Sequence, residues 1–162
     1  MKINSEIWKA DLFTAVNSIL KLATFKCYNK RQTDKFEKEI ILAVFCVRIL
    51  IERKKLSKRI LDKEIDVIKH PKKSLDSVTW LNSNEISELY DLDKSEPTKF
   101  KTEYLCNQII HSYILIPVPE KNQFTHILVC SDRRQATNLY RISVENIISL
   151  LNEVISDNLI DV

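Results

Sequence analysis

The sequence predicts a mainly α-helical protein: a helical bundle, then a small C-terminal antiparallel β-meander and a final helix. Apolar residues recur at helical spacing over most of residues 1–112, and the chain has no glycine and no proline before Pro71. Beyond Tyr113 the apolar runs become short and polar turns separate them. The 162 residues, 44% of them hydrophobic, suit one core. We therefore expect a single domain over 1–162, with the bundle in 1–112 and the meander and last helix in 113–162.

Two long helices open the predicted bundle. Ser5 suits the cap of a first helix that runs to about Cys27 and carries a broad apolar face. Asp34 and Glu37 resemble a capping box for a second helix over about 34–68. The middle of this second helix is apolar nearly all round, as expected of a central helix with neighbours on every side.

A polar excursion and a third long helix are expected next. Residues 70–97 have an irregular pattern, with one short helix over 84–92. Pro97 suits the first turn of a helix, because its fixed φ is helical and its missing N–H would have no partner there. The third long helix should therefore span 97–113.

The end of the chain changes period. The three short runs rich in β-branched and aromatic residues predict an antiparallel meander, with strands at 113–118, 124–130 and 138–142. Asn122 should take a positive φ in the first turn, where glycine is usual. Ser143 should cap the last helix, which has its apolar residues on one side up to Ile155.

The composition excludes several classes of protein. Walker loops, dinucleotide fingerprints and the nucleophile elbow of hydrolases all need glycine, and this chain has none. The four cysteines form no CxxC pair, so neither a metal site nor a disulfide is indicated. We expect no cofactor and no metal.

The sequence also predicts that the protein is cytoplasmic and has no membrane partner. The longest nearly apolar run, residues 40–51, is interrupted by Arg48 and is too short to span a bilayer. The sequence does not open on a basic and apolar leader with a cleavage site.

Charge is distributed unevenly along a chain whose net charge is only +3. Residues 53–73 contain nine Lys or Arg against three acids, and residues 74–96 contain six acids against one lysine. A basic run of this kind is either a phosphate-binding surface for nucleic acid or a solvated helix end whose cations complement the helix dipole. The second interpretation is favoured, since no aromatic residues interleave the first five cations of the run.

The strongest candidate for a site is a polar stripe on the third long helix. Glu103, Asn107 and His111 follow one another at intervals of four residues, which places them on one face of a helix that is otherwise apolar. Arg48 is the only charge in the apolar run of the second helix, and it needs a carboxylate to offset its desolvation. Glu52, one turn further on, and Glu103, on the other helix, are the alternatives.

A second candidate is the turn that contains Arg133 and Arg134. Two adjacent arginines between strands suit a phosphate or an acidic partner. An ordinary exposed turn is an equally good interpretation, because Asp132 stabilises turns through its own backbone.

Asn107 and His111 resemble the motif of the HEPN superfamily, a set of helical bundles that includes metal-independent ribonucleases of toxin and phage-defence systems. The family motif has an Arg, commonly followed by Asn, with a His a few residues later; here Cys106 stands at the Arg position. The resemblance implies a homodimer that acts on RNA, with His111 as base or acid and Asn107 orienting the phosphate or the imidazole. Arg48, Arg133 or Arg134 would replace the missing cation. The segments around Asn107 and Leu139 also resemble a group of bacterial hypothetical proteins.

The alternative is a non-enzymatic assembly or binding module that uses the same residues structurally. His111 would then donate to a backbone carbonyl of the meander, and Asn107 would bond Arg48 or Glu103 in a buried network that fixes packing. Cys106 would be a small buried hydrophobe rather than a nucleophile. An open cleft with an Arg within reach of His111 favours the enzyme, and a sealed site favours the module.

Overall fold

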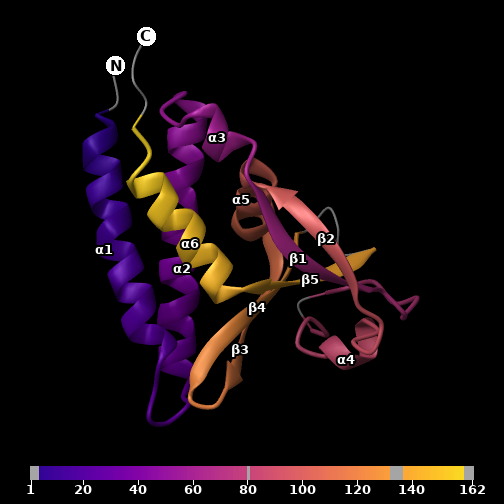
Figure 1. Cartoon of the computed structure of the whole chain (residues 1–162). Coiled ribbons are helices and arrows are strands. Elements are labelled where there is room, and N and C mark those ends of the chain that lie inside the picture. Colours follow the sequence, from indigo (N-terminus) through magenta and orange to yellow (C-terminus); the bar gives the residue numbers. More distant parts are fainter. Residues whose placement is uncertain (1–3, 80, 132–136, 159–162) are drawn as a thin grey trace.

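The computed structural model describes residues 4–79, 81–131 and 137–158, and it has an α/β fold (Figure 1). It is 48% helix and 28% strand, with six helices and one five-stranded antiparallel sheet. The prediction of a mainly α-helical bundle is therefore wrong, and with it the helical bundle that the HEPN resemblance implied for residues 1–112. None of the described helices has both the length and the apolar character needed to cross a membrane.

The elements follow one another in a simple order. The helices are α1 (Ser5–Ala23), α2 (Lys30–Glu52), α3 (Lys58–Leu61), α4 (Ile86–Leu89), α5 (Thr102–Ile110) and α6 (Val144–Ile155). The strands are β1 (Glu64–Pro71), β2 (Glu96–Lys101), β3 (Ser112–Glu120), β4 (Gln123–Ser131) and β5 (Asn138–Ser143). In the sheet they lie in the order β2-β1-β5-β4-β3.

The second helix ends sixteen residues before the predicted 68, at Glu52. Lys54 takes a φ of 54°, and its N–H bonds the carbonyl of Ile51 at 2.9 Å while the N–H of Lys55 bonds that of Leu50 at 2.8 Å. These two bonds are those of a Schellman motif, in which a residue with positive φ closes the helix. A lysine occupies the position that glycine usually fills, so the sequence carries no visible stop signal there.

Two strands replace helix that the sequence predicted. Residues 64–68 fall in β1, and residues 97–101 fall in β2, where Phe100 lies opposite Ile65. Pro97 is tolerated because β2 is an edge strand, where one side of the backbone has no ladder partner. Helix α5 begins only at Thr102, whose hydroxyl donates to the carbonyl of Ile60 at 2.5 Å. The predicted helix over 97–113 was thus too long at its start.

The three strands and the helix predicted at the end of the chain are present, but the strands belong to the five-stranded sheet, because β5 also pairs with β1. Strands β3, β4 and β5 pair antiparallel in that order. Lys121 and Asn122 both have positive φ between β3 and β4, as a two-residue type I′ turn requires. The Ser143 side chain accepts a hydrogen bond from the Asn146 N–H at the start of α6.

The sheet is covered on both faces. Alternate residues of β4 point to opposite sides: Ile127 and Val129 join the core beneath the helices, and Cys130 joins a smaller core on the other face. Helices α1, α2 and α6 lie together on one side of the sheet in Figure 1, while the segment with α4 lies apart from them. This segment contributes Val78, Ile86, Leu89 and Tyr90 to the smaller core.

Candidate functional site

Arg48 lies between two carboxylates where α2 packs against α5. Its Nε donates to Glu52 at 3.0 Å, and its Nη1 donates to Glu103. The two alternatives predicted for Arg48 are therefore both present. The hydrogen bond to Glu103, assisted by Glu52, raises the pKa of the guanidinium. With two carboxylates as partners, the charge of Arg48 is already balanced and is not free to hold a phosphate.

Glu103 and Asn107 line an open cavity of about 530 Å³ beside this cluster. Lys101 is also in its wall and pairs with Asp62 at 3.2 Å. The other lining residues are Ile51, Leu61 and Tyr104. Lys101 pairs with Asp62 and Glu103 pairs with Arg48, so each charged residue of the lining already has an opposite charge beside it.

His111 is at the other end of α5 and does not line this cavity. It is the exposed C-cap residue, and its N–H bonds the carbonyl of Asn107 at 3.1 Å. Glu103 and His111 are eight residues apart, or about 12 Å along a helix axis. Within the described chain, no hydrogen bond joins the side chain of Asn107 or His111 to another residue. The predicted stripe exists as a line of positions but not as a bonded network.

Cys106 points into the core. It is fully buried among the helices and the sheet, and burial raises the pKa of its thiol to about 12, although Arg48 acts in the opposite direction. A thiol with this pKa stays protonated at neutral pH and is a poor nucleophile. The position that matches the family's arginine is therefore inside the protein and not on a surface that a substrate reaches.

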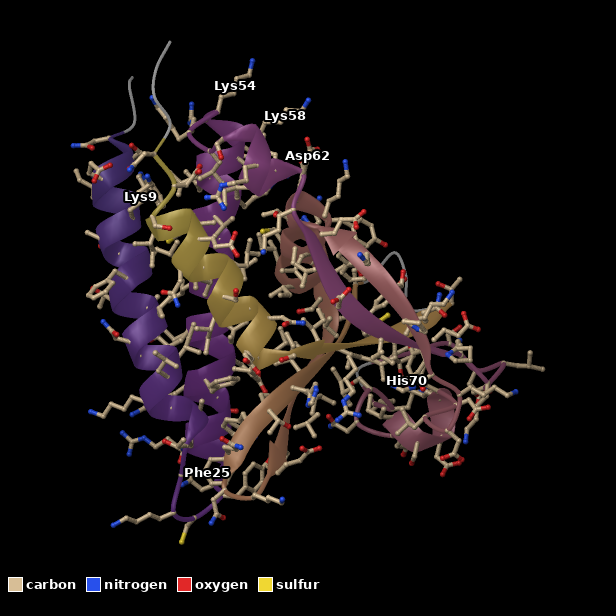
Figure 2. All side chains as sticks on the ribbon, viewed as in Figure 1. Lys9, Phe25, Lys54, Lys58, Asp62 and His70 are labelled. Carbon is tan, nitrogen blue, oxygen red and sulfur yellow. The ribbon has the colours of Figure 1, made fainter. Side chains whose placement is uncertain are left out.

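The basic residues that follow α2 differ in their surroundings. Figure 2 shows Lys54 and Lys58 projecting outward from the end of the molecule where α2 and α3 meet. Arg59 instead pairs with Glu153 at 3.0 Å and with Asp157 at 3.4 Å. Arg133 and Arg134, the second candidate site, lie outside the residues that the structure describes.

A cluster of side chains from three strands was missed by the sequence analysis. Arg141 on β5 lies 3.3 Å from Nδ1 of His126 on β4 and 3.4 Å from Glu120 on β3. Burial lowers the pKa of His126, and the charge of Arg141 lowers it further. His126 also lines a cavity of about 520 Å³ between α1, β4 and the start of α6. The sequence could have revealed this cluster only if the pairing register of the three strands had been known, because side chains alternate between the two faces of a sheet.

Further features bear on the kind of site. Among the described residues, no three His, Cys, Asp or Glu side chains gather in a way that could hold a metal ion. The four cysteines are free thiols. No family model matches the chain, and no curated protein or solved structure matches it either.

Proposed function

We propose that this chain is a non-enzymatic assembly module that binds a protein partner on the outer face of α2. The observation that carries the proposal is the position of Arg48, which is bonded to Glu52 and Glu103 at the far end of α5 from His111. A base and a cation separated by about two helical turns do not act on the same phosphate. The cluster joins α2 to α5 and serves packing.

An exposed apolar face on α2 supports the binding role. Ile41, Leu42 and Phe45 are 37%, 46% and 45% exposed, although each belongs to the middle of a long helix. Leu42 and Phe45 also line a shallow groove of about 340 Å³ between α1 and α2. Large apolar side chains that gather on one surface are typical of sites that a partner covers.

The proposal includes a cytoplasmic location. Free thiols are typical of a reducing compartment, and the four cysteines of this chain are unpaired.

The test is an RNA cleavage assay on the purified wild type, His111→Ala and Arg48→Ala proteins, with and without a chelator. If the chain is a non-enzymatic module, none of the three proteins should cleave RNA above a buffer control. Cleavage by the wild type that His111→Ala abolishes, in protein that stays folded by circular dichroism, would contradict the proposal.

A HEPN-like ribonuclease, or an RNA-binding derivative, is the second candidate. The exposure of His111 favours it, since an imidazole on the surface is accessible to a substrate. This candidate requires a cation from outside the Arg48 cluster. It predicts cleavage that depends on His111 and withstands the chelator, so the same assay separates the two candidates.

A further inference from the structure

We infer that the partner on the outer face of α2 is a second copy of this chain, packed antiparallel with Phe45 of both copies at the two-fold axis. The inference rests on the proposed function, because it names the occupant of the same surface.

The surface is a seam with the spacing of a helix pair. Lys38, Leu42, Phe45, Ile49 and Glu52 follow one another at intervals of four, three, four and three residues, which is the spacing of positions that face a partner helix in a coiled coil. The three central residues are apolar and the two outer ones are charged. Lys38 and Glu52 are exposed, and Ile49 is half-buried.

The seam is complementary to itself when it is reversed. Lys38 precedes Phe45 by seven residues, and Glu52 follows it by seven. In an antiparallel pair centred on Phe45, Lys38 of each copy therefore meets Glu52 of the other. A parallel pair in the same register places lysine on lysine and glutamate on glutamate, which is unfavourable. The charges thus select an antiparallel second copy.

The neighbours of the seam fit the same arrangement. Ile41 and Ile49 lie four residues on either side of Phe45, so they meet across the axis. Leu42 comes opposite Arg48, whose aliphatic stem provides apolar surface while its guanidinium stays with Glu52 and Glu103. The helix has 23 residues and is about 35 Å long, so the seam is long enough to form the centre of an interface of ordinary size.

Charge reversal tests the arrangement. Wild type, Lys38→Glu, Glu52→Lys and an equimolar mixture of the two variants are compared by sedimentation velocity over about 1 μM to about 1 mM protein, the range of weak to moderate affinity. Each variant alone places like charges together at both ends of the seam and should dimerise at least about tenfold more weakly. The mixture restores both pairs and should dimerise as the wild type does. Lys21→Glu, an exposed lysine on α1, is the matched control and should match the wild type.

The outcomes separate this inference from the proposed function. A wild type that is monomeric throughout, or single variants that dimerise like the wild type, would overturn the inference that the partner is a second copy. Neither result would contradict the proposal of a non-enzymatic module. A mixture that dimerises more tightly than the wild type would indicate a parallel pair and would also overturn it. Cleavage of RNA that depends on His111 would overturn the proposed function whatever the assembly state. Circular dichroism and thermal unfolding confirm that each variant is folded.

Discussion

Cys106 and Asn107 are adjacent in α5 but have different surroundings. Cys106 is fully buried, whereas Asn107 is half-buried in the wall of an open cavity. Side chains of consecutive helical residues point about 100° apart, so neighbours in a motif do not share an environment. The resemblance to a nuclease motif aligns residue types only. Because Cys106 is buried, a cation at its position would lie inside the core and not in a site.

An arginine at position 106 should therefore destabilise the fold rather than complete a site. Cys106→Arg places an unpaired charge in the core, and we expect it to lower the free energy of unfolding by at least about 3 kcal/mol or to prevent folding. Cys106→Ala, the control, should lose about 1 kcal/mol, since it removes one buried sulfur atom. Urea unfolding followed by circular dichroism measures both values. A Cys106→Arg protein as stable as the control, with new RNA cleavage, would instead support the nuclease.

At the scale of elements, the short helix α3 depends on a residue far along the chain. Asp157 is buried, and it accepts hydrogen bonds from the N–H of Ser57 at 2.7 Å and from its hydroxyl at 2.6 Å. Ser57 is the N-cap of α3 but makes no side-chain cap bond of its own. Lys9 on α1 donates to the carbonyl of Asp157. The segment after α6 thus holds the N-cap residue of α3 in place and ties it to α1.

Replacing Asp157 by asparagine should show how much its hydrogen bonds to Ser57 contribute to stability. Asp157→Asn keeps the shape but removes the charge and turns one acceptor into a donor, so we expect a loss of about 1–3 kcal/mol in the free energy of unfolding. Asp93→Asn, at an exposed position outside the helices and strands, is the control and should change it by less than about 0.5 kcal/mol. Equal urea midpoints for the two variants would show that the hydrogen bonds of Asp157 contribute nothing to stability.

At the scale of the whole molecule, the order of the strands brings together ionisable side chains that are far apart in the sequence. The antiparallel pairing of β3, β4 and β5 brings Glu120, His126 and Arg141 together. Burial and Arg141 lower the pKa of His126 in the folded protein. Near neutral pH the folded state therefore favours a neutral imidazole, which accepts the hydrogen bond from Arg141 at 3.3 Å.

This pKa shift predicts a stability that decreases in acid. A histidine whose pKa is lower when folded binds more protons in the unfolded chain, so the free energy of unfolding should fall as the pH drops below about 6.5. Above that pH both states are neutral at His126, and the contribution vanishes. His126→Gln should make the decrease between about pH 7 and about pH 5 shallower, which urea titrations at each pH measure. An unchanged slope in His126→Gln would show that His126 does not contribute to the loss of stability in acid.

The same scales explain which predictions were confirmed and which were wrong. The meander, the turn at Asn122 and the cap at Ser143 depend on local patterns, and the sequence contains them. The strands β1 and β2 were predicted as helix because no glycine or proline marks the end of α2, and because Pro97 suits either a helix start or an edge strand. The partners of Arg48 were predicted as alternatives, and packing of α2 on α5 satisfied both.

What the sequence by itself determined is the set of local elements whose signals lie within a few residues: the amphipathic α1 and α6, the apolar middle of α2, the hairpin turn and the exclusion of glycine-dependent sites. Tertiary structure alone decided that residues 64–71 and 96–101 pair as strands, that Cys106 is buried while His111 is exposed, and that Glu120, His126 and Arg141 meet. The physical reason is that strand pairing and burial depend on contacts between distant residues, and these override local preference when they remove more apolar surface from water.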